Sequence, residues 1–95
     1  MTQYMYLDEM QNLCLRLSNA FKVTRPEDKP LIDLYDAAEE GFFRKKENLE
    51  AETAGEPLVQ WQIERILGFQ SFVEKAESDA AYKLREAEVE KRTTA

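Results

Sequence analysis

The 95-residue chain contains no histidine and a single cysteine, Cys14. Without histidine it cannot build a Ser-His-Asp or Cys-His catalytic group, the usual zinc sites, or a di-iron site based on Glu-x-x-His. One cysteine cannot form an internal disulfide bond, which favours a reducing, cytoplasmic location. We therefore expect a protein that is not an enzyme, with no catalytic residue, no metal site and no cofactor.

Glycine, proline and long apolar runs are scarce as well. Three glycines and three prolines are too few for a sandwich or barrel of many short strands. No apolar run approaches the roughly 20 residues of a membrane span, and residues 1–4 lack the basic start of a signal peptide. Nineteen acidic against 13 basic residues give a net charge of −6, which argues against direct binding to nucleic acid or an anionic membrane.

What the chain does contain is apolar residues at helical spacing. A helix over about residues 4–22 is predicted by apolar residues three and four positions apart, namely Leu7, Met10, Cys14, Leu17 and Phe21. Cys14 falls within this stripe and is expected to be a buried core residue rather than a reactive thiol.

A second helix is expected over about residues 30–54, with Asp28 near its N-cap and Pro30 in its first turn. Its apolar stripe is Leu31, Leu34, Tyr35, Ala38, Phe42 and Leu49. Gly41 lies inside this helix, where glycine is unfavourable, and a close crossing with a neighbouring helix would explain it.

Gly55 and Pro57 mark the next boundary. Glycine suits the left-handed position after a helix, and proline suits the first turn of the following one. A third helix is predicted over about residues 57–92, with the stripe Val59, Ile63, Ile66, Phe69, Val73, Ala76, Ala80, Leu84 and Ala87. The expected fold is all-α, a three-helix bundle with a long C-terminal helix, in one domain over residues 1–95.

The third helix is longer than its neighbours can cover. At 1.5 Å per residue it spans about 54 Å, against about 37 Å and about 28 Å for the others. Because residues 58–73 are the more apolar half, we expect residues 76–92 to overhang. A frayed, solvated tail and a helix held by a second copy or another protein are both compatible with this pattern, and we favour the second.

Aromatic residues off the main stripes suggest a further surface. Trp61 and Phe72 are eleven residues apart and so point the same way, as do Ile32 and Phe43. They either widen the apolar faces within the bundle or form an exposed patch for a partner. The candidate partner interface consists of Phe43, Trp61, Phe72, Ala80, Leu84 and Ala87.

These observations favour a small non-catalytic interaction protein, meaning an adaptor, a regulator or a small subunit. The cations of residues 44–46 provide an alternative, a regulator linked to nucleic acid directly or through a DNA-binding partner. Carboxylates at Glu39, Glu40, Glu47 and Glu50 match these cations at helical spacing, which is typical of a solvated helix face. An acidic mimic of nucleic acid and an enzyme with carboxylate-bound metal are weaker alternatives.

Residues 34–39, together with Pro57 and Trp61, are similar to a segment of the Hha-type nucleoid-associated modulators, which are small helical bacterial proteins. Glu40 and Gly41 stand where those proteins have His-Arg, and the residues after Gly68 are unmatched. The resemblance assigns no family and implies only the regulatory alternative.

Overall fold

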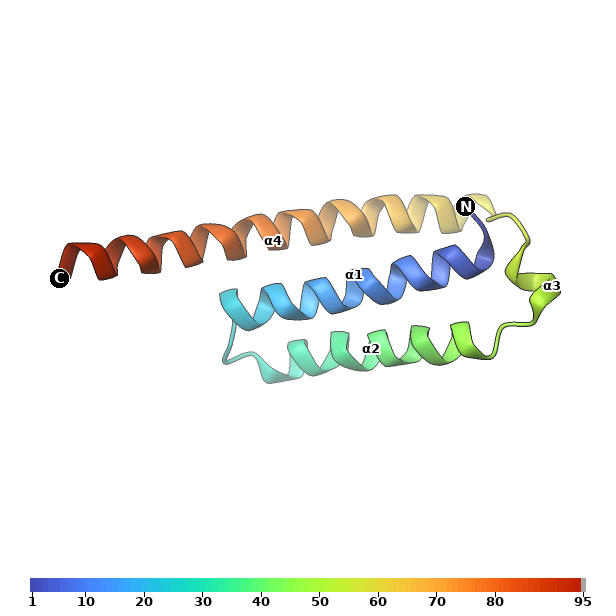
Figure 1. Cartoon of the computed structure of the whole chain (residues 1–95), viewed down its shortest axis with the longest axis horizontal. Helices are drawn as coiled ribbons and strands as arrows, with labels where there is room; N and C mark the ends of the chain where they lie inside the picture. Colours follow the sequence, from blue (N-terminus) through green and yellow to red (C-terminus); the bar gives the residue numbers. More distant parts are fainter. Residues whose placement is uncertain (95) are drawn as a thin grey trace.

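The computed structural model describes the backbone of residues 1–94 and the side chains of residues 1–92. Over this range the chain forms helices α1 (Gln3–Thr24), α2 (Lys29–Glu47), α3 (Ala51–Ala54) and α4 (Gln60–Thr94). The predicted all-α bundle with a long C-terminal helix is confirmed (Figure 1). None of the helices in the described range is apolar enough over a sufficient length to cross a membrane.

The bundle is open, with α1 in the middle. α1 packs against both α2 and α4, whereas no Cα atom of α2 lies within 8 Å of a Cα atom of α4 in the described range. Figure 1 shows the three long helices side by side, and the molecule measures 60 × 22 × 17 Å. Its radius of gyration is 16.6 Å, against about 12 Å for a compact chain of this length. The long helices therefore form an elongated layer.

Polar contacts join α1 to α4 along the whole length of α1. Successive pairs are Gln3 with Gln62, Glu9 with Gln70, Arg16 with Glu77, and the Thr24 carbonyl with Lys83. Because the two positions in each pair differ by about the same number, the two helices run parallel, and α2 runs antiparallel to both.

Most of the core comes from α1. The buried cluster consists of Tyr6, Met10, Leu13, Leu17, Phe21, Ile32, Ile66 and Val73. The apolar stripe predicted for the first helix is therefore confirmed, and so is the burial of Cys14. In α2 the prediction was wrong for Leu34, whose side chain is 60% exposed. Leu34 lies a turn from Leu31 on the side of α2 that turns away from α1.

The long C-terminal helix begins at Gln60 and not at Pro57. Thr2 and Pro57 form an antiparallel bridge, and the Gln3 amide donates to the Glu56 carbonyl at 2.9 Å, which keeps this segment extended. The Gln62 side chain then accepts a hydrogen bond from the Val59 N–H, half of a capping box.

Two further boundaries differ from the prediction. Gly55 has a right-handed backbone conformation, so the left-handed cap expected there is absent. The second helix ends at Glu47 rather than at Ala54. Lys46 already lies level with Asp8, near the start of α1. Seven more helical residues would carry α2 about 10 Å farther, past the end of α1 and its buried face. The chain instead turns at Asn48 and crosses towards α4 through α3.

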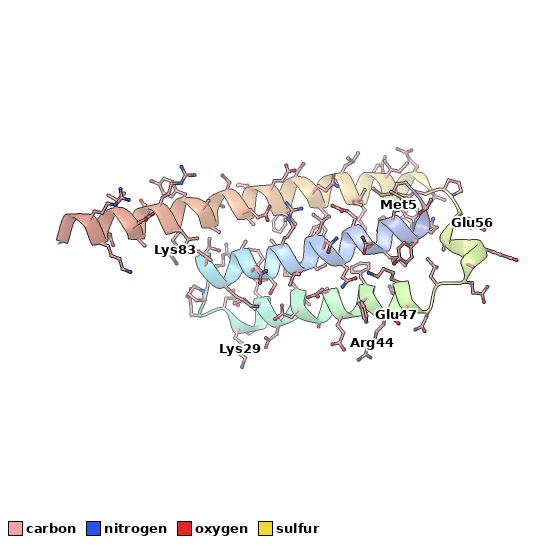
Figure 2. The ribbon with its side chains drawn as sticks, in the orientation of Figure 1. Met5, Lys29, Arg44, Glu47, Glu56 and Lys83 are labelled. Atoms are coloured by element: carbon pink, nitrogen blue, oxygen red, sulfur yellow. The ribbon has the colours of Figure 1, made fainter. Side chains whose placement is uncertain are left out.

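The unsupported part of α4 is also shorter than expected. Lys83 donates to the Thr24 carbonyl at the end of α1, so α4 extends past its neighbour only beyond Lys83, not from Ala76 (Figures 1 and 2). Ala76 packs against the core, and Ala80 is only 7% exposed. The parallel register with α1 explains the difference, because it supports α4 for about two turns more than the helix lengths suggested.

The packing predicts the cost of removing core side chains. Leu17→Ala and Ile66→Ala are each expected to lower the free energy of unfolding by about 2–5 kcal/mol, since both side chains are buried and their truncation leaves a cavity. Leu34→Ala, at an exposed site, should change it by less than about 0.5 kcal/mol. Urea unfolding followed by circular dichroism measures all three. Losses below about 1 kcal/mol at both core sites would contradict the packing.

Candidate interaction groove

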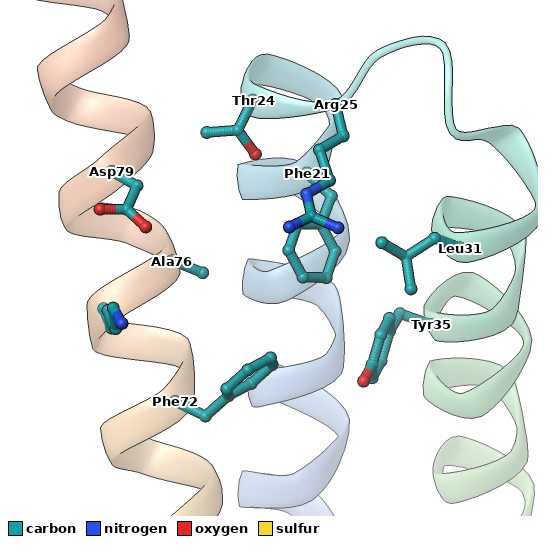
Figure 3. Close-up of a pocket in the computed structure, with 9 residues that line it drawn as sticks. Phe21, Thr24, Arg25, Leu31, Tyr35, Phe72, Ala76 and Asp79 are labelled. Carbon is teal, nitrogen blue, oxygen red and sulfur yellow. The ribbon is translucent and has the colours of Figure 1, made fainter.

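An apolar groove runs along one face of the layer, with α1 as its floor and α2 and α4 as its walls. It consists of two adjoining hollows that share Tyr35 and Phe72. The first hollow, of about 500 Å³ (Figure 3), is lined by Phe21, Thr24, Arg25, Leu31, Tyr35, Phe72, Lys75, Ala76 and Asp79. The second, of about 470 Å³, is lined by Met10, Cys14, Tyr35, Ala38, Phe42, Glu64, Arg65, Gly68, Phe69 and Phe72.

Aromatic rings bridge the groove where the backbones stay apart. The Phe21 ring lies 5.8 Å from Tyr35 and 6.5 Å from Phe72, centroid to centroid. Tyr35 also stacks on Phe69 at 6.4 Å. Figure 3 shows Phe72 and Tyr35 extending from opposite walls towards Phe21. These rings join α2 to α4 through side chains alone, which leaves the space above them open.

The groove follows from helical periodicity on both walls. On α2 the lining residues Leu31, Tyr35, Ala38 and Phe42 are spaced by four, three and four positions, and so share one face. On α4 the lining residues Phe69, Phe72 and Ala76 are three and four positions apart and likewise share one face. Each wall thus presents an apolar stripe that turns partly to α1 and partly to solvent.

Glycine interrupts the α4 wall at Gly68. A Cβ atom placed there would have no neighbouring atom within 4 Å, and the same holds at Gly41. The close helix crossing expected at Gly41 is therefore absent. Packing within this chain requires neither glycine, although glycine in a helix costs up to about 1 kcal/mol relative to alanine.

Charged groups around the groove carry both signs. The lining includes three cations, Arg25, Arg65 and Lys75, and two carboxylates, Glu64 and Asp79. Two of the cations lie over aromatic rings, Arg65 at 5.4 Å from Trp61 and Arg25 at 5.9 Å from Phe21. In the described residues no group of three acidic or cysteine side chains is placed to hold a metal ion. The groove therefore offers apolar contact with a mixed-charge rim.

The structure brings together only part of the candidate interface. Phe72 lines both hollows and is 50% exposed, and Trp61, eleven residues earlier on the same side of α4, is 56% exposed. Phe43 is 41% exposed but belongs to another surface, where the Lys46 ammonium lies over its ring. The remaining members lie along α4 away from the groove lining: Ala80 is covered by α1, whereas Leu84 and Ala87 are exposed beyond it.

Sequence reasoning did not single out the floor and the α2 wall as a binding surface. Met10, Phe21, Tyr35 and Phe42 were assigned to the core, and each does pack there. Whether these residues also border a groove depends on how α2 and α4 are placed around α1. Helical periodicity within one segment does not contain that information.

The basic cluster at residues 44–46 does not form a continuous patch. Arg44 pairs with Glu40 at 2.6 Å on the exposed side of α2, and Lys45 lies over the Phe42 ring. Lys46 donates to Asp8 on α1 at 2.9 Å, and this hydrogen bond raises the pKa of the Lys46 ammonium. The three side chains are therefore engaged with three different groups.

A bidentate ion pair holds α4 against α1 behind the groove. The Arg16 guanidinium donates to both carboxylate oxygens of Glu77, at 2.9 and 2.5 Å. These hydrogen bonds lower the pKa of the Glu77 carboxyl and raise that of Arg16. The pair is partly exposed, so it mainly sets the register of the two helices rather than adding much stability.

Burial, and to a smaller degree the charge of Glu39, raises the pKa of the Cys14 thiol to about 11. Since only the thiolate reacts, a thiol reagent at pH 8 is expected to label native Cys14 at least about tenfold more slowly than the urea-unfolded chain. In a Leu34→Cys variant the added, exposed thiol should label rapidly in the folded protein. Equal rates for Cys14 in the two states would show that the groove floor is accessible.

No protein-family model, curated protein or solved structure matches the chain. The fold and the groove are therefore the observations on which a function can rest.

Proposed function

We propose that this chain is a small non-catalytic interaction protein whose groove between α2 and α4 binds an amphipathic helix of a protein partner. The observation that carries the proposal is the groove itself, an open apolar channel over the core helix with aromatic residues on both walls. Such a channel, aromatic and aliphatic at its centre with charged residues at its rim, suits side chains packed by shape and apolar contact.

The dimensions of the groove suit a helix. Its lining extends from Leu31 to Phe42 on α2, about 16 Å, and from Glu64 to Asp79 on α4, about 22 Å. A partner helix of about three to four turns fills this length. It would lie across from α1 and complete a four-helix arrangement, in which each helix has two neighbours.

The chemistry of the lining defines the expected partner sequence. Apolar side chains at i, i+3, i+4 and i+7 would reach Phe21, Tyr35 and Phe72. The rim carries charges of both signs, so it selects weakly for the net charge of the partner. An adaptor, a regulator or a small subunit would use such a surface, and the buried lone thiol supports a reducing, cytoplasmic setting.

Engagement of the basic cluster weakens the alternative of direct nucleic-acid binding. Lys46 is paired with Asp8 and Arg44 with Glu40, so few free cations remain there to replace counterions on a phosphate backbone. Accordingly, we rank a regulator acting on nucleic acid below the helix-binding groove.

A photo-crosslinking comparison tests the groove. Benzoylphenylalanine replaces Phe72, within the groove, or Phe43, a half-exposed aromatic outside it. In an extract of the native cell, illumination should covalently attach a protein to position 72 and not to position 43. A Tyr35→Glu substitution in the Phe72 variant should reduce the yield, because it places a charge in the apolar channel.

Two results would contradict the proposal. One is equal yield from positions 72 and 43, which indicates contact without selection of a surface. The other is no protein attached at position 72 while the variant remains folded by circular dichroism.

A further inference from the structure

We propose that the groove recognises its partner helix at two different anchor sites. The second hollow takes an aromatic side chain, and the first hollow takes a carboxylate that lies about seven positions away along the same partner helix. This inference rests on the proposed function of the groove and defines the sequence of the helix that it binds. It is carried by the different linings of the two hollows, by the size of the second and by the charges of the first.

The second hollow is the more apolar of the two. Among the described residues, Glu64 and Arg65 are the only charged ones in its lining. The Arg65 guanidinium lies over the Trp61 ring of its own helix, 5.4 Å from the ring centroid. The remaining surface of this hollow is aromatic, aliphatic or sulfur-containing, so its occupant is expected to be an apolar side chain.

Rings on both walls favour an aromatic occupant. Tyr35 and Phe42 line the second hollow from α2, and Phe69 and Phe72 line it from α4. The Met10 thioether belongs to its floor on α1. An aromatic side chain gains ring–ring and sulfur–ring contacts here in addition to the burial of its own area, and an aliphatic side chain does not.

The size of the second hollow suits a large ring. Ala38 and Gly68 are the smallest lining residues of the α2 and α4 walls, and they leave space between the larger rings. The volume of the hollow is about 470 Å³, whereas a closed cavity of about 150 Å³ already holds a benzene molecule. A phenyl or indole group therefore fits, together with the atoms that join it to the partner backbone.

The first hollow offers charge instead. Arg25 and Lys75 belong to its lining together with one carboxylate, Asp79. In the described residues neither cation forms an ion pair, and Arg25 lies over the Phe21 ring at 5.9 Å (Figure 3). The lining thus has one more positive than negative charge, in a chain whose net charge is −6. A carboxylate of the partner would meet two cations here, and charge-assisted hydrogen bonds are stronger than neutral ones.

The distance between the two hollows determines the spacing of the two anchors. On α4 the second hollow is lined within residues 64–72 and the first within residues 72–79, so their midpoints lie at residue 68 and at residues 75–76. This separation corresponds to about 11 Å along α4. On a partner helix that lies along α4, about seven residues span the same length and return to the same face. The expected motif is Phe, Tyr or Trp with Asp or Glu about seven positions away, and the order of the two reports the direction of the partner helix.

Selection from a peptide library tests the motif. The probe is an mRNA-displayed library of alanine- and glutamine-based helices of about four turns, with the positions of one face randomised. Peptides retained by the full wild-type chain should be enriched in an aromatic residue at one position and in Asp or Glu about seven positions away. A Lys75→Glu chain should enrich Lys or Arg at the latter position, because the net charge of the first hollow is then reversed. Lys29→Glu makes the same change at an exposed side chain that points away from α1, and should leave the selection as in the wild type (Figure 2).

Fluorescence anisotropy of the best selected peptide tests the second hollow separately. Gly68→Leu adds a side chain to the lining of this hollow and should raise the dissociation constant at least about tenfold, whereas Gly41→Leu, outside the lining, should leave it within about twofold. Both sites have space for a Cβ atom, so both variants should remain folded, which circular dichroism verifies. In the peptide, exchange of the aromatic residue for leucine should weaken binding about two- to tenfold.

Selected peptides without an aromatic preference overturn the proposal, and so does an acidic preference that is the same for Lys75→Glu and the wild type. A wild-type chain that retains no peptide above background, or a Gly68→Leu chain that binds as tightly as the wild type, also overturns it. These results leave the proposed function standing if a protein still becomes crosslinked at position 72. Absence of any crosslink there, together with a failed selection, removes both.

Discussion

The structure depends on the burial of α1 from two sides. α1 provides five of the eight residues of the buried cluster and is the one long helix, within the described range, that packs against both others. Since the α2 and α4 backbones stay apart, each is held mainly through α1, and their direct contact is through rings such as Tyr35 and Phe69. The same arrangement leaves the groove open, so Phe21 and Met10 are at once core residues and the floor of the candidate binding surface.

The parts of the fold that periodicity could predict are those determined within one helix. The stripe from Leu7 to Phe21 correctly identified the first helix and the burial of Cys14, because residues three and four apart necessarily share a face. The start of α4 was missed because it is set by Thr2 and Gln3, which hold residues 56 and 57 extended from the other end of the chain. The hydrogen bond from the Val59 N–H to the Gln62 side chain is local, but the contacts that keep residues 56 and 57 extended come from the opposite end of the chain.

The candidate surface was predictable to a similar extent. The eleven-residue spacing placed Trp61 and Phe72 on one side of a helix, and both side chains are half exposed on the structure. Phe43 had an equivalent spacing with Ile32, yet it faces Lys46 on a different surface. The side of α2 that borders the groove is determined by how α2 and α4 pack around α1. This is a property of the tertiary structure, and the spacing of residues within one helix does not predict it.

α1 and α4 are neighbours in space but far apart along the chain. The loop between α1 and α2 has only four residues, whereas the contacts Gln3–Gln62 and Arg16–Glu77 join residues 59 and 61 positions apart. Closing a longer loop costs more entropy, and contacts of high sequence separation form more slowly. The α1–α2 hairpin is therefore expected to form first and α4 to dock last. By the same reasoning α4 is expected to be the first long helix to detach when the fold opens locally. One wall of the groove therefore lies on the long helix with the lowest free energy of local unfolding.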